Sequence, residues 1–586
     1  MPVLSAVADR DDRADGPLPS NVTTAPGTRP AAGGPDVDTA ADTDADGVEG
    51  RPDPAAGVVP IGAIPSIVAP IRPRRRVLPP PPDDRARGWL VTAIITAVAA
   101  VVRFAGIGQY SDVGPPPFDG KVGTPLFDGK YYAIQAAEVL RNGGVEDNQG
   151  FGVVVHPPFG KQLIAIGEWL VGYNPTGWRL ASAVAGVVSV LLIIRVTRRM
   201  TRSTLLGGIA GVLLICDGVS HVMARTALLD VFQEVFVLAA FACIIADRDQ
   251  VRARLAAALA DGSLPGHRAG IALGARWWRF AAGVLLGLTT AVKWSGAYWI
   301  VAFFAMVLIW DFCARREVGI RRPIWAVIRR DLLPNIWSLT IVPALVYVAS
   351  WWAWFASETV WPRHTLVAVP PNRSDWKSGL LYDLASTWSN ELWQWTWKML
   401  DFHSHLLTPT DPAQRHPWES KPWTWPLGTR PVLYFVQGPT TGCGDGRNDC
   451  VQRIFLIGTP ALWWVSLFVL VWALWKAIGR LDWRYAAVLV AYGAGYLPWF
   501  TNLDRQMYFF YATPLAPFLV IGIALVLGDI LGPAQVGVER RLTSVAVVAI
   551  YVGLVVANFI WLWPVLTGEP ITPDRLQMET WLPSWG

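Results

Sequence analysis

The sequence predicts an all-α protein that crosses a membrane many times. Of its 586 residues, 52% are hydrophobic and only 16% are charged, whereas a typical soluble protein has about 25% charged residues. Its mean hydropathy is positive, at +0.33. The chain also has 32 Trp against 14 Tyr, and amphipathic aromatic rings collect at membrane interfaces. These values exclude a typical soluble protein and a wholly disordered or fibrous chain.

Residues 1–88 are predicted to form a disordered cytoplasmic tail. They contain no Phe, Trp or Tyr and are rich in Pro, Gly, Ala and Asp. Such a composition buries too little apolar surface to offset the entropy lost on ordering. The tail ends in arginines between residues 72 and 87, and basic clusters beside a membrane helix attract anionic lipid.

Eleven apolar stretches follow the tail, and each is predicted to be a membrane-spanning helix. A perpendicular helix needs about 20 residues to span the bilayer, so the ends of the shorter stretches are expected to extend by a few residues. The stretches are Trp89–Ile107, Gly177–Ile194, Leu205–Val219, Ala227–Ala246, Phe280–Val292, Tyr298–Phe312, Ile336–Phe355, Ile457–Trp475, Tyr485–Trp499, Ala512–Leu531 and Val545–Trp563.

Lys and Arg predict the orientation, because they accumulate in cytoplasmic loops. With a cytoplasmic N-terminus, every predicted inner loop is rich in arginine. The C-terminus and two large loops, residues 108–176 and 356–453, then lie outside the cytoplasm. Residues 89–355 form an N-terminal membrane half, and residues 454–586 form the C-terminal membrane helices. The net charge of +5 thus reflects topology, and no nucleic-acid partner is expected.

The first external loop contains a repeated Phe-Asp-Gly-Lys motif, at Phe118–Lys121 and Phe127–Lys130. Asp128, or its counterpart Asp119, combines a carboxylate with a neighbouring lysine and is a candidate general base. The alternative is a pair of Asp-Gly turns without a catalytic role. After these motifs, residues 131–140 form an amphipathic stretch that suits a membrane surface.

Further polar residues are predicted on the same membrane face. His156 and two prolines precede a predicted short helix that starts near residue 160, and Lys161 lies in its first turn, where a phosphate is favoured. The alternatives are that His156 caps this helix and that Arg179 snorkels to the interface. Asp217, His221, Arg225, Asp230 and Glu234 form a second group, in which Arg225 and Asp230 are alternatively a neutralising pair.

The later part of the chain gives weaker signals. Arg505 lies among aromatic residues, which is also typical of an interfacial anchor. The Trp-rich second loop contains His403, His405 and His416, but no Cys accompanies them and their spacing does not suit a zinc site. Cys443 and Cys450 are the one candidate disulfide pair, because they lie close together in a polar loop.

The chain resembles the protein O-mannosyltransferases, specifically the actinobacterial form that uses polyprenyl-phosphate mannose, within the GT-C class of glycosyltransferases. The resemblance extends from Trp89 to Trp563. The motifs that carry it are FDGKYYA (127–133), GVEDN (144–148), VVHPPFGKQLIAIGEWL (154–170), LLICDGVSHVMARTALLD (213–230), HPWESKPWTWPL (416–427) and RQMYFFYATPLAPF (505–518).

The resemblance implies a GT-C fold of about 11 spans in the plasma (inner) membrane, with an external active site. It implies inverting transfer of mannose from polyprenyl-phosphate mannose to Ser or Thr of exported proteins, with the secretion channel as a candidate partner. The phosphate needs cations but no proton, so neither a divalent metal nor another cofactor is expected. The implied roles are Asp128 as base; Arg179, Arg225, Lys161 and Arg505 as phosphate-binding residues; and Asp119, His156, Asp230 and His403 in support.

One position departs from the family pattern. The resemblance implies an Asp-Glu pair in the first external loop, and here the pair reads Asp128-Gly129. The enzyme then works without the glutamate, or Asp119 replaces it, or the chain is a weakened paralogue or silent partner subunit. Another GT-C transferase that uses a lipid-phosphate sugar also stays open. A transporter is disfavoured, because no long internal repeat is present.

Overall fold

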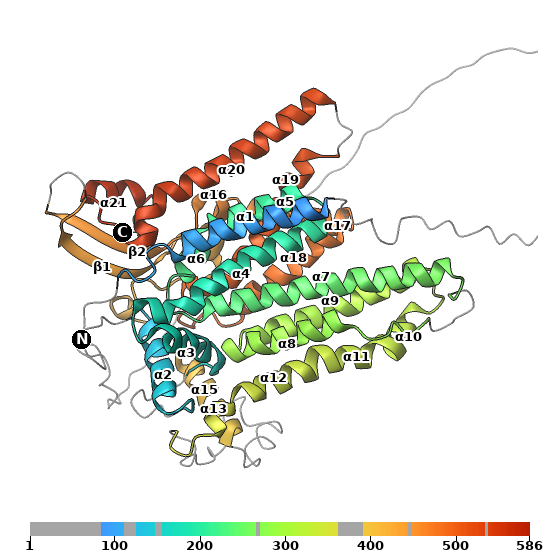
Figure 1. Cartoon of the computed structure of the whole chain (residues 1–586), viewed down its shortest axis with the longest axis horizontal. Helices are drawn as coiled ribbons and strands as arrows, with labels where there is room; N and C mark the ends of the chain where they lie inside the picture. Colours follow the sequence, from blue (N-terminus) through green and yellow to red (C-terminus); the bar gives the residue numbers. More distant parts are fainter. Residues whose placement is uncertain are drawn as a thin grey trace, which may run out of the picture. The chain divides into compact units, whose positions relative to one another are not determined.

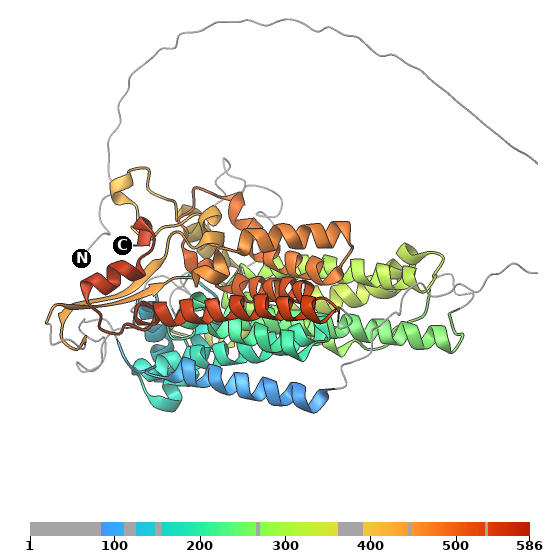
Figure 2. The same cartoon turned by 90° about the horizontal axis from the view of Figure 1, so that it is seen from above.

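A computed structural model of the chain describes residues 84–585, except for 111–124, 147–154, 265–269, 361–390, 444–447 and 534–536. Long helices dominate this part, and Figures 1 and 2 show them lying side by side with their axes roughly aligned. The shorter helices α2 (Gly129–Arg141) and α3 (Phe159–Val171) cross one end of this bundle. The predicted tail up to residue 83 and Asp119 lie outside the described residues.

Each of the eleven predicted stretches coincides with one helix or with consecutive helices. The first begins at Arg85, four residues before the predicted Trp89, because the arginine-containing turn continues the helix. The helices are α1 (Arg85–Phe104), α4 (Pro175–Thr201), α5 (Thr204–Ile215), α6 (Gly218–Met223), α7 (Asp230–Ala260), α8 (Trp277–Val292), α9 (Gly296–Glu317), α10 (Pro323–Val327), α11 (Leu333–Ile336), α12 (Val342–Ser350), α13 (Trp352–Phe355), α16 (Pro460–Trp463), α17 (Ser466–Gly479), α18 (Trp483–Tyr496), α19 (Ala516–Leu531) and α20 (Val538–Thr567).

The protein is a multi-pass membrane protein. Within the described residues, seven helical segments are long and apolar enough to cross a membrane. Others that match predicted spans, such as α5 and α8, are apolar but shorter, at 12 and 16 residues. The count of eleven spans therefore stays a prediction.

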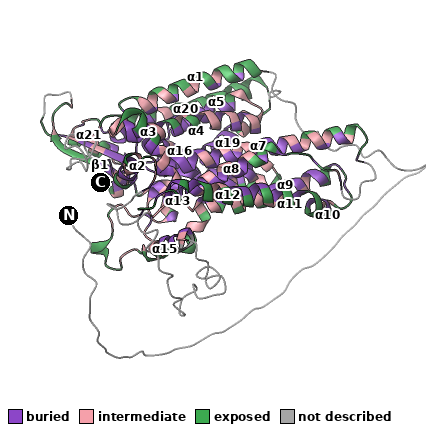
Figure 3. Cartoon of the chain, turned by 60° about the horizontal axis from the view of Figure 1, so that its bottom comes forward, coloured by how far each residue is buried: buried purple, intermediate pink, exposed green. Residues whose placement is uncertain are grey.

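Burial follows the expected pattern of a helical bundle in lipid. Every residue of α19 from Ala516 to Leu527 is buried, so this helix lies at the centre of the bundle. Helix α1 instead exposes Leu90, Ile94 and Val101, and Figure 3 shows its outward face largely exposed. An exposed row of large apolar side chains is stable where lipid replaces water.

The second predicted external loop contains a β-hairpin that the helix-based prediction missed. Strands β1 (Val432–Thr440) and β2 (Cys450–Leu456) pair antiparallel. The signal was available, since both strands are rich in β-branched and aromatic residues. A disulfide joins Cys443 to Cys450, with their Cα atoms 5.9 Å apart, so the predicted pair is bridged.

The described part of this loop, which includes the hairpin, forms a folded cap. Helix α15 (Glu391–His405) precedes the hairpin, and α21 (Pro573–Glu579) follows the last long helix. Trp425 is fully buried and donates a hydrogen bond from Nε1 to Ser420 Oγ at 3.0 Å. Part of the tryptophan excess therefore fills the core of this cap.

Candidate active site

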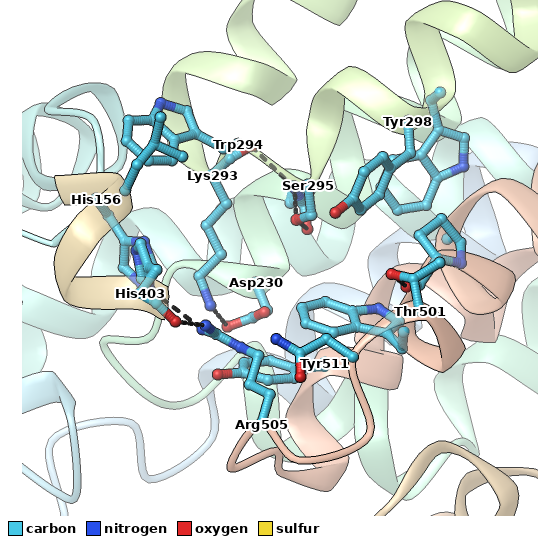
Figure 4. Close-up of a pocket in the computed structure, with 17 residues that line it drawn as sticks. His156, Asp230, Lys293, Trp294, Ser295, Tyr298, His403, Thr501, Arg505 and Tyr511 are labelled. Atoms are coloured by element: carbon cyan, nitrogen blue, oxygen red, sulfur yellow. Dashed lines mark hydrogen bonds and ion pairs between the residues drawn. The ribbon is translucent and has the colours of Figure 1, made fainter. Parts of the chain in front are cut away.

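A cavity of about 290 Å³ opens at the end of the bundle where α2 and α3 lie. Its walls come from the start of α7, the α8–α9 turn, α15 and the segment between α18 and α19. Figure 4 shows charged, histidine and aromatic side chains gathered around this one space. Four of the predicted site residues line it: His156, Asp230, His403 and Arg505.

An ion pair between Lys293 and Asp230 forms one side of the cavity. Lys293 Nζ lies 2.7 Å from Asp230 Oδ2, and their side chains are only 7% and 2% exposed. Asp230 is the first residue of α7, where the helix dipole favours a carboxylate. One turn later, Gln233 Nε2 donates to Ser295 Oγ at 2.9 Å, which ties α7 to the turn that carries Lys293. The alternative pairing of Asp230 with Arg225 is therefore wrong.

Sequence reasoning missed Lys293 as a site residue. A lone lysine directly after the apolar stretch that ends at Val292 was the available signal, because ionisable residues at a membrane edge are usually functional. Its carboxylate partner lies 63 positions earlier in the chain. No local pattern links the two residues.

Arg505 and two histidines form another part of the cavity wall. Arg505 Nη1 donates to the carbonyl oxygen of His403 at 2.6 Å, and its Nη2 lies 3.2 Å from His403 Nδ1. The rings of His156 and His403 stack with centroids 5.5 Å apart. Burial lowers the pKa of His403 to about 4 and the pKa of His156 well below its usual range. Both rings are therefore neutral at pH 7, and the charge on this side comes from Arg505.

Asp128 lies beside the cavity, at the residue before α2. Burial raises the pKa of its carboxyl to about 6; the charges of Lys293 and Lys130 oppose the rise, and Asp230 adds to it. Asp128 thus interacts electrostatically with the ion pair that lines the cavity. Its neighbour Phe127 anchors the turn, with its ring centroid 5.1 Å from that of Tyr434. A carboxylate with this pKa is mostly ionised at pH 7 and is suited to accept a proton.

The backbone does not require the glycine that follows Asp128. A Cβ atom placed on Gly129 meets Ala227 Cβ at 3.4 Å and Pro125 Cβ at 3.6 Å, which are ordinary van der Waals distances. Gly129 begins a regular helix, α2. The Cβ atom of a larger residue at position 129 therefore fits without a steric conflict.

Arg179 and Arg225 lie elsewhere, around a separate small void. Arg179 Nη1 donates to the carbonyl of Ile107 at 2.9 Å, and its guanidinium also donates to the two carbonyls that follow at Gln109 and Tyr110. Arg225 Nη1 donates to the carbonyls of Arg103 at 3.0 Å and Ala105 at 2.5 Å. Arg225 thus binds the backbone at the C-terminal end of α1, where helix carbonyls lack partners. Arg179 binds the segment that follows this helix.

Lys161 is also outside the cavity. It lies in the first turn of α3, close to the predicted helix start, and its Nζ is 3.6 Å from Glu146 Oε2. The two side chains are 2% and 1% exposed. The structure thus buries the predicted phosphate-binding lysine against a carboxylate. Of the predicted cations, only Arg505 faces the cavity, and Lys293 joins it there.

The remaining polar residues of the second predicted group are buried in the bundle. Asp217, His221 and Glu234 are at most 1% exposed, and Asp217 accepts a hydrogen bond from Trp463 Nε1 at 2.7 Å. Within the described ranges, no three His, Cys, Asp or Glu side chains are placed to hold a metal ion. The expectation that no metal is required stays a prediction.

Two family models match the chain. The model of dolichyl-phosphate-mannose-protein mannosyltransferase matches residues 174–357, and the model of the C-terminal four TMM region of protein-O-mannosyltransferase matches residues 388–585. Together these matches cover more than half of the chain.

Curated relatives match over most of their length. A polyprenol-phosphate-mannose–protein mannosyltransferase of Mycolicibacterium smegmatis is 52% identical, over 87% of this chain and 96% of the relative. A protein of the same name from Mycobacterium tuberculosis is 52% identical over 86% and 93% of the two chains. The solved structure of the S. cerevisiae protein O-mannosyltransferase Pmt1–Pmt2 complex bound to the sugar donor has a TM-score of 0.61, at 14% identity, and covers 85% of this chain and 92% of that one. This last similarity shows a shared fold.

Proposed function

This chain belongs to the dolichyl-phosphate-mannose-protein mannosyltransferase family, and we propose that it transfers mannose from polyprenyl-phosphate mannose to Ser and Thr hydroxyls of exported proteins. One observation carries the mechanism. The carboxylate Asp128, with a pKa near 6, lies beside a cavity that presents the cations Lys293 and Arg505.

The two cations hold the donor phosphate. A lipid phosphate leaves as a stable anion, so it needs positive charge and hydrogen-bond donors but no proton. Arg505 offers a planar guanidinium and Lys293 a point charge, from different walls of the cavity. The neutral rings of His156 and His403 pack behind Arg505 and keep its side chain directed into the cavity.

Asp128 acts as the general base. It accepts the hydroxyl proton of Ser or Thr while the oxygen bonds to the anomeric carbon and the bond from that carbon to the phosphate oxygen breaks. The transition state has oxocarbenium character, as in glycosyl transfer generally. Attack from the face opposite the phosphate inverts the anomeric centre, so a β-linked donor gives an α-linked product.

The membrane location follows from the donor. A polyprenyl chain stays in the bilayer, so its phosphate can be reached only at a membrane face. The cavity lies at one end of the helical bundle, which is at such a face. We place this end on the extracytoplasmic side of the plasma membrane, with a cytoplasmic N-terminus, because the arginine-rich loops lie at the other end. The acceptor arrives unfolded, as it leaves the secretion channel.

The test is a transfer assay with the purified full-length protein in liposomes. We expect label to move from polyprenyl-phosphate mannose to a Thr-rich peptide, and Asp128→Asn to lower the rate about 10²- to 10⁴-fold, the usual contribution of a general base. Asp411→Asn is the matched control, because Asp411 is an exposed carboxylate in the cap whose capping role Asn also fulfils. Absence of transfer by the parent protein, or equal rates for Asp128→Asn and the parent, would refute the proposal.

A silent partner subunit is the second candidate, and Gly129 is the observation that favours it. That candidate requires no transfer by the chain alone and co-purification with an active transferase. The assembled set of Asp128, Lys293 and Arg505 instead supports an active enzyme.

A further inference from the structure

A second cavity lies toward the opposite end of the helical bundle from the proposed active site. Its volume is about 640 Å³, and it lies between α1, the last turns of α4, the middle of α7 and the start of α8. Five arginines line it, and no carboxylate does. They are Arg85, Arg195, Arg198, Arg199 and Arg202; we call this cavity the arginine pocket.

The positive charge of the arginine pocket is only partly neutralised. Asp84 pairs with Arg198 at 2.8 Å, and Asp249 is shared between Arg199 and Arg202, each at 2.9 Å. In the part of the chain that the structure describes, Arg85 and Arg195 form no ion pair. Five guanidinium groups thus face two carboxylates, and the surplus favours an anion.

The contacts of Arg195 orient its guanidinium at the pocket but do not neutralise its charge. Its guanidinium lies 3.8 Å from the ring centroid of Trp89. Its Nη1 has only long contacts, at 3.5 Å, to the carbonyl of Gly88 and the hydroxyl of Thr92. A cation–π contact orients a guanidinium and leaves its hydrogen-bond donors free for another group. The donors of Arg195 are therefore available to an anionic ligand.

The other walls of the arginine pocket are apolar. They consist of Leu192 and Val196 on α4 and small residues such as Ala242 on α7. Two partly exposed tryptophans, Trp89 and Trp278, lie beside the arginines, and tryptophan favours the level of lipid headgroups. A free inorganic anion would contact only the arginines and gain nothing from the apolar walls. An amphiphile with a phosphate headgroup matches both the arginines and the apolar walls.

We propose that the arginine pocket binds the headgroup of an anionic phospholipid, whose acyl chains lie along the apolar faces of α4 and α7. Arginine forms paired hydrogen bonds with phosphate oxygens, and basic pockets between membrane helices bind such headgroups. This site uses none of the residues of the proposed active site and does not depend on the proposed function.

The experiment measures lipid binding to the intact purified protein in detergent by native mass spectrometry, together with the thermal shift. The probes are phosphatidylglycerol, phosphatidylcholine with the same acyl chains, and inorganic phosphate. We expect phosphatidylglycerol to bind and to raise the melting temperature, and the other two to have little effect. The double variant Arg85→Gln/Arg195→Gln should weaken phosphatidylglycerol binding about thirtyfold, from the usual contribution of two arginines near a lipid surface.

Arg329→Gln/Arg330→Gln is the matched control, because it removes two exposed arginines that do not line the arginine pocket. It should bind phosphatidylglycerol like the parent. If the first double variant fails to fold, the single variant Arg85→Gln should still weaken binding about fivefold, since Arg85 is exposed in the first turn of α1. Equal binding of phosphatidylcholine, equal protection by inorganic phosphate, or unchanged affinity in the Arg85 variants would overturn the proposal.

Discussion

The pH dependence of mannose transfer tests whether Asp128 is the base. Burial raises the pKa of Asp128 to about 6, and a base accepts a proton only when it is ionised. Asp128 is then about 90% ionised at pH 7 and about 10% ionised at pH 5. We expect kcat/KM to fall as the pH drops through 6, and to lose about tenfold for each further unit.

A single exposed lysine allows the position of this acidic limb to be moved. The charge of Lys130 lowers the pKa of Asp128, so Lys130→Gln should shift the limb to higher pH and leave the plateau at pH 8 unchanged. An exposed ion pair contributes at most about 1 kcal/mol, so the shift is at most about 0.7 pH unit. Arg141→Gln removes one positive charge from the other end of α2 and serves as the control, with an unchanged limb.

The assay is the initial rate of label transfer at low donor concentration, because kcat/KM reports the free enzyme. A profile that is flat down to pH 5 would refute the assignment of Asp128 as base. So would a limb that moves to lower pH in Lys130→Gln. Residual activity of Asp128→Asn with the same limb would assign the limb to another group.

Two further predictions concern the surroundings of Asp128. Gly129→Glu should fold and match or exceed the parent rate at pH 8, because a Cβ atom there has its nearest contact at 3.4 Å; a large loss of rate would contradict this interpretation of the loop. Lys293→Gln should destabilise the protein by about 3–5 kcal/mol, because it leaves a buried carboxylate unpaired, and Asp230→Asn/Lys293→Gln should recover most of that loss. Denaturation in detergent measures the free energy of unfolding of the single variants and the double variant. If the losses for Asp230→Asn and Lys293→Gln simply add up in the double variant, the 2.7 Å pair contributes no coupling energy.

The membrane helices were predictable from the sequence because lipid requires long apolar stretches, and each predicted stretch is helical in the structure. The ends were less accurate: α4 continues to Thr201 and α20 starts at Val538, since both helices carry charged turns beyond the apolar core. The hairpin was missed because β1 and β2 lie in a polar loop and are paired by long-range contacts. A hydropathy pattern identifies segments buried in lipid, but it does not predict how strands pair outside the membrane.

The candidate site was predictable only in part, for a different reason. A basic residue at a membrane edge binds a ligand, or it satisfies the open carbonyls of a helix end, and the same residue type serves both purposes. Arg225 serves the second, because it donates to a carbonyl in the last turn of α1, and Arg179 serves the same purpose in the segment just after that helix. Arg505 faces the cavity because its segment pairs with Leu407 of the cap. Which role an arginine takes depends on contacts between distant segments.

The glycine after Asp128 also has an electrostatic consequence. Asp128 already has a second carboxylate near it, because the charge of Asp230 raises its pKa. A glutamate at position 129 would add another negative charge next to Asp128 and raise that pKa further, since like charges disfavour ionisation. The acidic limb of Gly129→Glu should therefore lie at higher pH than that of the parent, even where the plateau rates agree. With glycine at position 129, the proposed base stays ionised down to a lower pH. The second carboxylate near Asp128 is instead that of Asp230, which is paired with Lys293 and lies on a different helix, α7.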